Sequence, residues 1–151
     1  MAGRGEMIPN EGSYCEIDPV VKDQWGIPVL RFHWEWSDHE LTQVAHMQRT
    51  FADIISACGG QVPSGGTEKD RRDAIHPGGE IIHEVGGAIM GENRLKSVTN
   101  QFGATWDVPN LYLTDGAPFV SNADKNPTLT LMALAWRSAD QLVGEMAKGN
   151  I

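Results

Sequence analysis

A strict alternation of apolar and polar residues predicts a β-strand over residues 30–36. This two-residue period puts the apolar side chains on one face of a sheet and the polar ones on the other. Shorter apolar runs predict further strands at residues 14–18, 80–85 and 110–114, with breaks at Pro19 and at residues 26–28. The alternating residues are Leu30, Phe32, Trp34 and Trp36 on the apolar face, and Arg31, His33 and Glu35 on the polar face.

Two stretches have the spacing of amphipathic helices. The first begins at Ser37, which forms a capping-box pattern with Glu40, and it ends at the glycine pair 59–60. The second begins at Asn126, an N-cap residue followed by proline in the first turn. The expected apolar stripes are Leu41, Val44, Ala45, Phe51, Ile54 and Ile55 in the first helix, and Leu131, Leu134, Ala135, Leu142, Val143 and Met146 in the second.

This order of elements predicts an α+β fold, with two long helices packed on a small mixed or antiparallel sheet. We expect one domain over residues 1–151, with a surface loop at 61–79, where the sequence is rich in glycine and charge. We also expect Trp34, Trp36 and Trp136 to fill the core rather than to stack on sugar rings.

Composition excludes several classes of protein. The chain has 151 residues, a formal net charge of −8 and no basic tract, so we expect no nucleic-acid binding, which needs clustered Lys and Arg. No apolar run approaches the ~18 residues of a membrane span, and the first residues lack the apolar stretch of a signal peptide. The sequence leaves the compartment open between cytoplasm and periplasm. Cys15 and Cys58 are isolated, which excludes a disulfide framework and a CxxC metal knuckle.

The histidines give weak signals for chemistry. His39 and His46 are seven residues apart and could share a helix face, but there is no HExxH motif, so we expect no metal site. His83, at the end of an expected strand and before Gly86–Gly87, has the position of a general base. From spacing alone, a structural histidine at a strand end is the simpler interpretation. Likewise, Asn126 at a helix start indicates either an anion site or a plain N-cap.

Three segments together carry a family resemblance. They are His83–Gly91 (HEVGGAIMG), Val108–Phe119 (VPNLYLTDGAPF) and Asn126–Ala135 (NPTLTLMALA), with Arg137 following in register. In this order and spacing they resemble the C-terminal part of the glucose-methanol-choline (GMC) oxidoreductases, where the second and third segments read "NLYVxDGSxFP" and "NPTxTxxALAxR". The resemblance covers about residue 80 to the end of the chain, and residues 5–60 resemble the preceding part more loosely.

The resemblance implies an FAD-dependent oxidation of a CH–OH group in an alcohol or sugar. Hydride passes from the substrate carbon to flavin, and His83 corresponds to the histidine that takes the alcohol proton. Asn126 corresponds to the second catalytic position, which is a histidine or an asparagine in the family. Asp115 and Gly116 would lie near the flavin, and the helix start at Asn126, Pro127 and Thr128 would face its pyrimidine end.

The sequence departs from the family pattern in two places. Gly87, Ala88 and Ile89 stand in the stretch where family members carry Thr and Arg, as in "GTxRMG". No GxGxxG turn for the FAD pyrophosphate is present, so we expect this chain alone not to hold FAD. The expected partners are an alcohol or sugar substrate and an FAD-binding N-terminal half or subunit. The alternative is a non-catalytic relic or binding module that keeps the fold without flavin.

Overall fold

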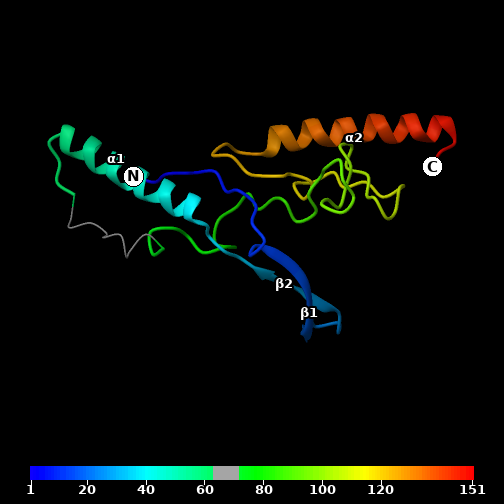
Figure 1. Cartoon of the computed structure of the whole chain (residues 1–151), viewed down its shortest axis with the longest axis horizontal. Helices are drawn as coiled ribbons and strands as arrows, with labels where there is room; N and C mark the ends of the chain where they lie inside the picture. Colours follow the sequence, from blue (N-terminus) through cyan, green and yellow to red (C-terminus); the bar gives the residue numbers. More distant parts are fainter. Residues whose placement is uncertain (63–71) are drawn as a thin grey trace. The chain divides into compact units, whose positions relative to one another are not determined.

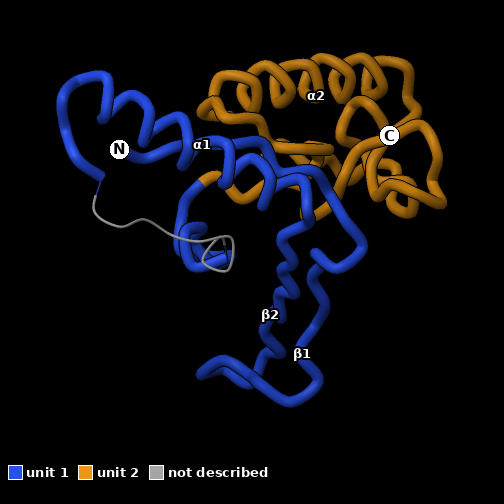
Figure 2. Tube along the Cα trace, turned by 60° about the vertical axis from the view of Figure 1, so that its left-hand side comes forward, with its two compact units in different colours: residues 1–82 blue, residues 83–151 orange. Residues whose placement is uncertain are grey.

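The computed structural model describes residues 1–62 and 72–151 and divides the chain into two compact units (Figure 2). Unit 1 is Met1–Ile82, and unit 2 is His83–Ile151. The element order is β1 (Tyr14–Lys22), β2 (Pro28–His33), α1 (Asp38–Ala57) and α2 (Thr128–Lys148), as Figure 1 shows. Two helices and a small antiparallel sheet confirm the predicted α+β class. Of the predicted loop at 61–79, residues 63–71 lie outside the described residues.

In unit 1, β1 and β2 form an antiparallel hairpin in which Tyr14 pairs with His33 and Ile17 with Leu30. The turn is built around Asp23, whose Oδ1 accepts hydrogen bonds from the N–H groups of Trp25 and Ile27, each at 2.9 Å. β1 continues beyond the predicted end at residue 18, because a shift of register after Ile17 accommodates the proline that follows. β2 ends at His33, three residues before the alternating pattern ends.

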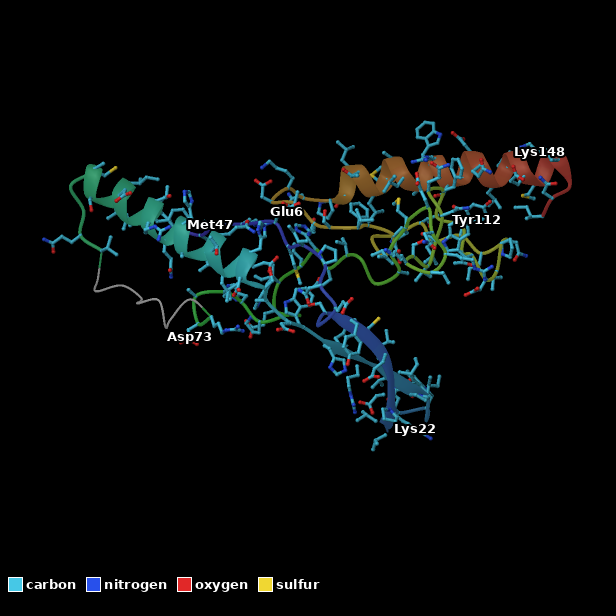
Figure 3. The ribbon with its side chains drawn as sticks, in the orientation of Figure 1. Glu6, Lys22, Met47, Asp73, Tyr112 and Lys148 are labelled. Carbon is cyan, nitrogen blue, oxygen red and sulfur yellow. The ribbon has the colours of Figure 1, made fainter. Side chains whose placement is uncertain are left out.

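The hairpin has the two faces that the alternation predicts, but its apolar face is exposed. On the polar face Asp18 is 6% exposed and forms an ion pair with Arg31 at 2.8 Å. On the apolar face Leu30 is 54% and Phe32 is 70% exposed. Side chains project from both sides of the hairpin in Figure 3, where Lys22 marks the region of its turn. A two-stranded sheet has no further layer of its own to cover such a face.

α1 begins as predicted. Ser37 Oγ accepts the N–H of His39, and the capping box between Ser37 and Glu40 is complete. The helix ends one residue before Cys58, and Gly59 follows with a φ of 76°, the left-handed conformation that glycine adopts at a helix end. Local chemistry therefore sets both ends of α1.

The first ten residues run beside α1 and are held by its side chains. Gln43 accepts the N–H of Glu6 and donates to the Glu6 carbonyl, at 3.1 and 2.7 Å. The carboxylate of Glu40 accepts the N–H of Ile8 at 3.0 Å. A Cβ on Gly3 would lie 2.5 Å from the sulfur of Met47, so a larger residue at position 3 would require the Met47 side chain to move.

Unit 2 consists of turns and loops from residue 83 to 127, followed by α2, which lies along them in both views (Figures 1 and 2). The predicted strands at 80–85 and 110–114 are wrong. The first is turn and loop, and the second contributes only an isolated bridge between Tyr112 and Ala104. The second segment instead lies in a loop that is held by backbone hydrogen bonds. Leu113 N–H donates to the Gly103 carbonyl, and Thr105 N–H donates to the Leu111 carbonyl.

α2 has an unpredicted second apolar face. Ser138 is buried, and the predicted stripe residues Leu131, Leu134, Ala135 and Leu142 are partly buried. A further set of apolar residues recurs at spacings of three and four residues and is exposed; we call this set the outer stripe. The outer stripe comprises Leu129, Met132, Trp136, Ala139, Val143 and Met146.

The outer stripe overturns part of the core prediction. Trp136 is 73% exposed, so it does not fill a core, and Trp34 is 39% exposed. Val143 and Met146, which were expected on the buried stripe, are 64% and 60% exposed. Trp34 and Trp36 instead meet edge to face at 5.3 Å. Periodicity showed that α2 is amphipathic, but it could not tell which of two neighbouring apolar faces the unit itself covers.

Candidate functional site

The first motif segment, residues 83–91, lies against the loop at 115–119 through three backbone hydrogen bonds. The N–H groups of Gly86, Ala88 and Met90 donate to the carbonyls of residues 116, 117 and 118, at 3.2, 3.0 and 2.9 Å. Gly86 has a φ of 85°, and a Cβ there would lie 3.3 Å from the Phe119 carbonyl oxygen. Two segments that sequence reasoning treated separately are thus joined as one structure within unit 2.

His83 is in a strained backbone conformation. Its φ is 84°, and among the described residues it is the one non-glycine residue with a positive φ. This left-handed conformation costs a residue with a side chain roughly 1–3 kcal/mol and is frequent at functional sites. The expectation of a strand-end histidine is therefore wrong, because an extended strand requires a negative φ.

The imidazole of His83 is available for chemistry. The side chain is partly buried, and neither ring nitrogen has a hydrogen bond or ion pair to any residue that the structure describes. His33 and His76 differ, since each has a ring nitrogen on a carboxylate, that of Glu16 at 2.9 Å and that of Glu80 at 3.2 Å. The His83 ring can therefore accept a proton without first breaking an ion pair.

The structure also positions Asp115 and Gly116. Asp115 is exposed, and its Oδ1 accepts the N–H of Ala117 at 2.9 Å, which closes the turn. A Cβ on Gly116 would lie 3.1 Å from Val85 Cγ1 and 3.8 Å from Leu131 Cδ1. Gly116 therefore sits between the histidine segment and the second turn of α2, so all three motif segments meet around it.

The start of α2 differs by one residue from the prediction. Pro127, not Asn126, is the N-cap residue, with φ and ψ of −81° and −11°, and its carbonyl accepts the N–H of Leu131. Proline reaches this conformation because its ring fixes φ near −65°. The cap residue makes no side-chain hydrogen bond, and the first turn has no acidic residue. Asn126 and Thr128 flank the cap and are exposed.

Sequence reasoning missed Asn122. Its side-chain amide nitrogen donates to the main-chain carbonyl of His83 at 2.8 Å, across 39 residues of sequence, and the bond is partly buried. No motif or periodicity marks this residue, because it lies outside the expected helices and strands, between two motif segments. The only signal in the sequence was that Asn122 is polar and lies four residues before Asn126, the expected catalytic asparagine.

Charged groups near the start of α2 form a local pair. A hydrogen bond from Lys125 lowers the pKa of Asp124 below its ordinary value, and the charge of the lysine acts in the same direction. The pair immediately precedes Asn126 in sequence. Because the lysine balances the aspartate, the pair adds little net charge to the positive end of the helix.

Two hollows in unit 2 lie away from His83 and Asn126. One of about 420 Å³ lies along α2 and is lined by Phe102, Trp136 and Arg137 among others, with the guanidinium 4.9 Å from the Phe102 ring centre. A second, of about 10 Å³, includes Thr114 and Asp115 in its lining. Neither is lined by His83 or Asn126. Within residues 1–62 and 72–151, no three His, Cys, Asp or Glu side chains gather as a metal site.

The helices and the two cysteines bear on membrane insertion and on disulfide formation. None of the helices described here is long and apolar enough to cross a membrane. Cys15 and Cys58 are both free thiols at exposed positions, in agreement with their isolation in the sequence.

Known relatives match most of the chain. The chain is 32% identical over 138 residues to 2-methyl-1,2-propanediol dehydrogenase of Mycolicibacterium austroafricanum, covering 91% of this chain and 24% of that protein. It is 30% identical over 139 residues to the gluconate 2-dehydrogenase flavoprotein of Pantoea cypripedii, covering 92% and 23%. It is 28% identical over 144 residues to the fructose dehydrogenase large subunit of Gluconobacter japonicus, covering 95% and 25%.

The chain thus spans about a quarter of the length of the curated relatives that it matches. The family model described as GMC oxidoreductase matches residues 9–135, which include both helices' starts, His83 and Asn126. The match extends the resemblance through most of unit 1, beyond the motifs that first indicated it. This chain belongs to the GMC oxidoreductases and contains the family's C-terminal domain.

Proposed function

We propose that this chain is the substrate-side, C-terminal part of an FAD-dependent oxidoreductase that acts on CH–OH groups of an alcohol or sugar. Three relatives support the substrate class, since their names describe dehydrogenases of a diol, of gluconate and of fructose. One of these names is that of a flavoprotein. The observation that carries the proposal is the unpaired imidazole of His83, held on a strained backbone beside the other two motif segments.

The residues around the start of α2 fit a flavin. A helix N-terminus has unpaired N–H groups and a partial positive charge, which favour an electron-rich ring edge. In α2 no acidic residue of the first turn and no side chain of the cap residue offsets that charge. We assign the cofactor contacts to Asp115, Gly116, Asn126, Pro127 and Thr128. When bound, the flavin accepts the hydride from the substrate carbon.

The chain's own residues handle the proton. His83 takes the proton of the alcohol hydroxyl, and Asn126 donates its side-chain N–H to the alcohol oxygen. The base needs a free ring nitrogen, which His83 has in the described structure. The asparagine holds the oxygen in place while the proton leaves, because an amide donor cannot itself take the proton.

An FAD-binding half is the proposed partner. The outer stripe leaves Trp136 and Leu129 73% and 80% exposed on the helix that starts at the proposed cofactor contacts. An apolar surface of this kind on a soluble protein marks a contact with another protein surface. We assign the outer stripe to contact with the half that would hold the rest of the flavin.

Removing the base tests the proposal. In the complete flavin-loaded enzyme, His83→Ala should slow flavin reduction by alcohol about 10²–10⁴-fold, because a positioned general base contributes that factor. The measurement is anaerobic stopped-flow bleaching of the oxidised flavin. His76→Ala is the matched control, because His76 is exposed in unit 1 and paired with Glu80. Unchanged bleaching in His83→Ala would favour the non-catalytic binding module instead.

A further inference from the structure

We infer that Asn122 is a positioning residue for His83: its side-chain amide holds the His83 carbonyl and thereby fixes where the imidazole points. This inference rests on the proposed function, in which His83 is the base. It starts from two independent observations, the left-handed backbone of His83 and the 2.8 Å hydrogen bond from Asn122 Nδ2 to its carbonyl.

A left-handed histidine needs something to hold it. Without restraint, a residue with a Cβ returns to a negative φ, which would turn its side chain to another direction. Strained residues persist only where the surrounding structure over-determines them. The backbone bonds to the loop at 116–118 begin at Gly86, three residues after His83, so they do not hold the His83 peptide itself.

The bond from Asn122 acts on that peptide directly. A donor on the His83 carbonyl fixes the peptide plane that joins His83 to Glu84, and it therefore restricts ψ of His83. Both partners are partly buried, which protects the bond from exchange with water. The bond also joins two segments 39 residues apart, so it acts between the histidine segment and the loop that leads into α2.

The same loop carries the second proposed catalytic residue. Asn126 follows Asn122 by four residues, and α2 begins two residues later. The hydrogen bond from Asn122 to the His83 carbonyl, which we call the clamp, therefore sets the position of the base relative to the donor that holds the alcohol oxygen. Since small displacements of reacting groups cost rate much more than binding, the clamp should govern the rate rather than the affinity for alcohol.

Asn122→Asp tests the clamp in the complete flavin-loaded enzyme. At pH 8 the aspartate is ionised, has almost the same shape, and presents an acceptor to the carbonyl where the asparagine presented a donor. We expect flavin reduction at saturating alcohol to fall roughly 10–100-fold, with a half-saturating alcohol concentration changed less than about threefold. Asn122→Ala, which removes the donor without adding repulsion, should give a smaller fall in the same direction.

A second readout does not depend on activity. In enzyme labelled with ¹³C at histidine Cε1, the His83 signal, identified by its loss in His83→Gln, should shift or broaden in Asn122→Asp. Asn110→Asp is the matched control, because Asn110 is exposed in the same unit and the chemical change is identical. This control should leave both the rate and the His83 signal unchanged.

The outcomes separate the clamp from the proposed function. If His83→Ala abolishes reduction while Asn122→Asp leaves the rate and the His83 signal unchanged, the clamp is wrong and the base assignment stands. If His83→Ala has no effect on reduction, the base assignment fails. In that case a moved His83 signal in Asn122→Asp still supports the clamp, and an unmoved one overturns it.

Discussion

The two long helices begin in opposite ways. The first turn of α1 contains Asp38 and Glu40, and the side chains of Ser37 and Glu40 satisfy its N–H groups through a capping box. The first turn of α2 has no acidic residue, and its cap residue Pro127 makes no side-chain hydrogen bond. The helices are almost equally long, at 20 and 21 residues, so length does not explain the difference.

This difference separates a helix start closed by a capping box from one whose cap residue makes no side-chain hydrogen bond. Capping stabilises a helix by about 0.5–2 kcal/mol. In α1 the capping residue Glu40 also accepts the N–H of Ile8, so the same side chain holds the N-terminal segment. The cap residue of α2 makes no side-chain hydrogen bond, and its first turn lies in the third motif segment. We propose that this end of α2 faces the flavin in the complete enzyme.

The largest effect on α1 should come from Glu40→Ala. Glu40 is 3% exposed, and its carboxylate accepts hydrogen bonds from the N–H groups of Ile8 and Ser37, at 3.0 and 2.8 Å. Leaving both donors without a partner should destabilise the start of α1 by roughly 2–4 kcal/mol. Hydrogen exchange measured by mass spectrometry should then be roughly 30–700-fold faster at the first turn of α1.

Asp38→Ala is the control for that variant. Asp38 is exposed and contributes mainly through its charge near the helix dipole, worth about 0.3–1 kcal/mol. Exchange in α1 should accelerate less than about sixfold. Equal effects of the two substitutions would show that the buried carboxylate is not what holds α1 and the N-terminal segment together.

Acid should loosen unit 1 through Asp18 and Glu40. Hydrogen bonds from the N–H groups of Val21 and Val20 lower the pKa of Asp18, and Arg31 lowers it further. Burial raises the pKa of Glu40, but hydrogen bonds from Ser37 and Ile8 outweigh it, so this pKa is lowered too. The stability that Asp18 and Glu40 contribute to unit 1 is fully present above the unfolded-state pKa near 4. It is lost as the pH falls through their lower folded-state pKa values.

The measurement is the stability of the hairpin and of α1 against pH. Hydrogen exchange, corrected for its intrinsic pH dependence, should show loss of protection between about pH 5 and 2. Asp18→Asn should flatten this dependence in the hairpin and leave that of α1 unchanged. A hairpin whose protection stays constant down to pH 2 would contradict the role of the Asp18 carboxylate.

The outer stripe should make the isolated chain self-associate. Its exposed residues include Met132 and Val143, at 62% and 64% exposure. Replacing both by lysine should shift the chain towards monomer in analytical ultracentrifugation, because charge opposes burial of that face. Exposed Val108 and Val120, replaced by lysine, form the matched control outside α2. If the control substitutions change self-association as much as the outer-stripe substitutions do, the chain does not self-associate through the outer stripe.

The sequence predicted α1 well because its signals are local. The capping box at Ser37 and the glycine at 59 act within one turn of the helix end, so no distant contact is needed to interpret them. The hairpin's two faces also followed from alternation, since side-chain direction in a strand depends only on position. The α+β class and the family followed from these elements and the three motif segments.

The candidate site was less predictable because distant residues build it. The strand expected at 80–85 fails because His83 adopts a positive φ, a conformation that is uncommon for any residue with a side chain and that no local pattern here indicates. The bond from Asn122, 39 residues away, accompanies that conformation, and no pattern in either segment indicates it. Trp136 was expected in the core because hydrophobicity alone does not show which side of α2 the unit covers.

We propose that α2, and not α1, presents its N-terminus to the flavin. The most direct measurement is the midpoint potential of the flavin in the complete enzyme after Thr130→Glu, which adds a carboxylate to the exposed first turn of α2. We expect a potential more negative by roughly 10–40 mV, because the new charge opposes negative charge on the reduced ring. Thr130→Gln and Asp38→Asn should leave the potential unchanged. A potential that Thr130→Glu does not move, or that Asp38→Asn moves as much, would contradict the claim.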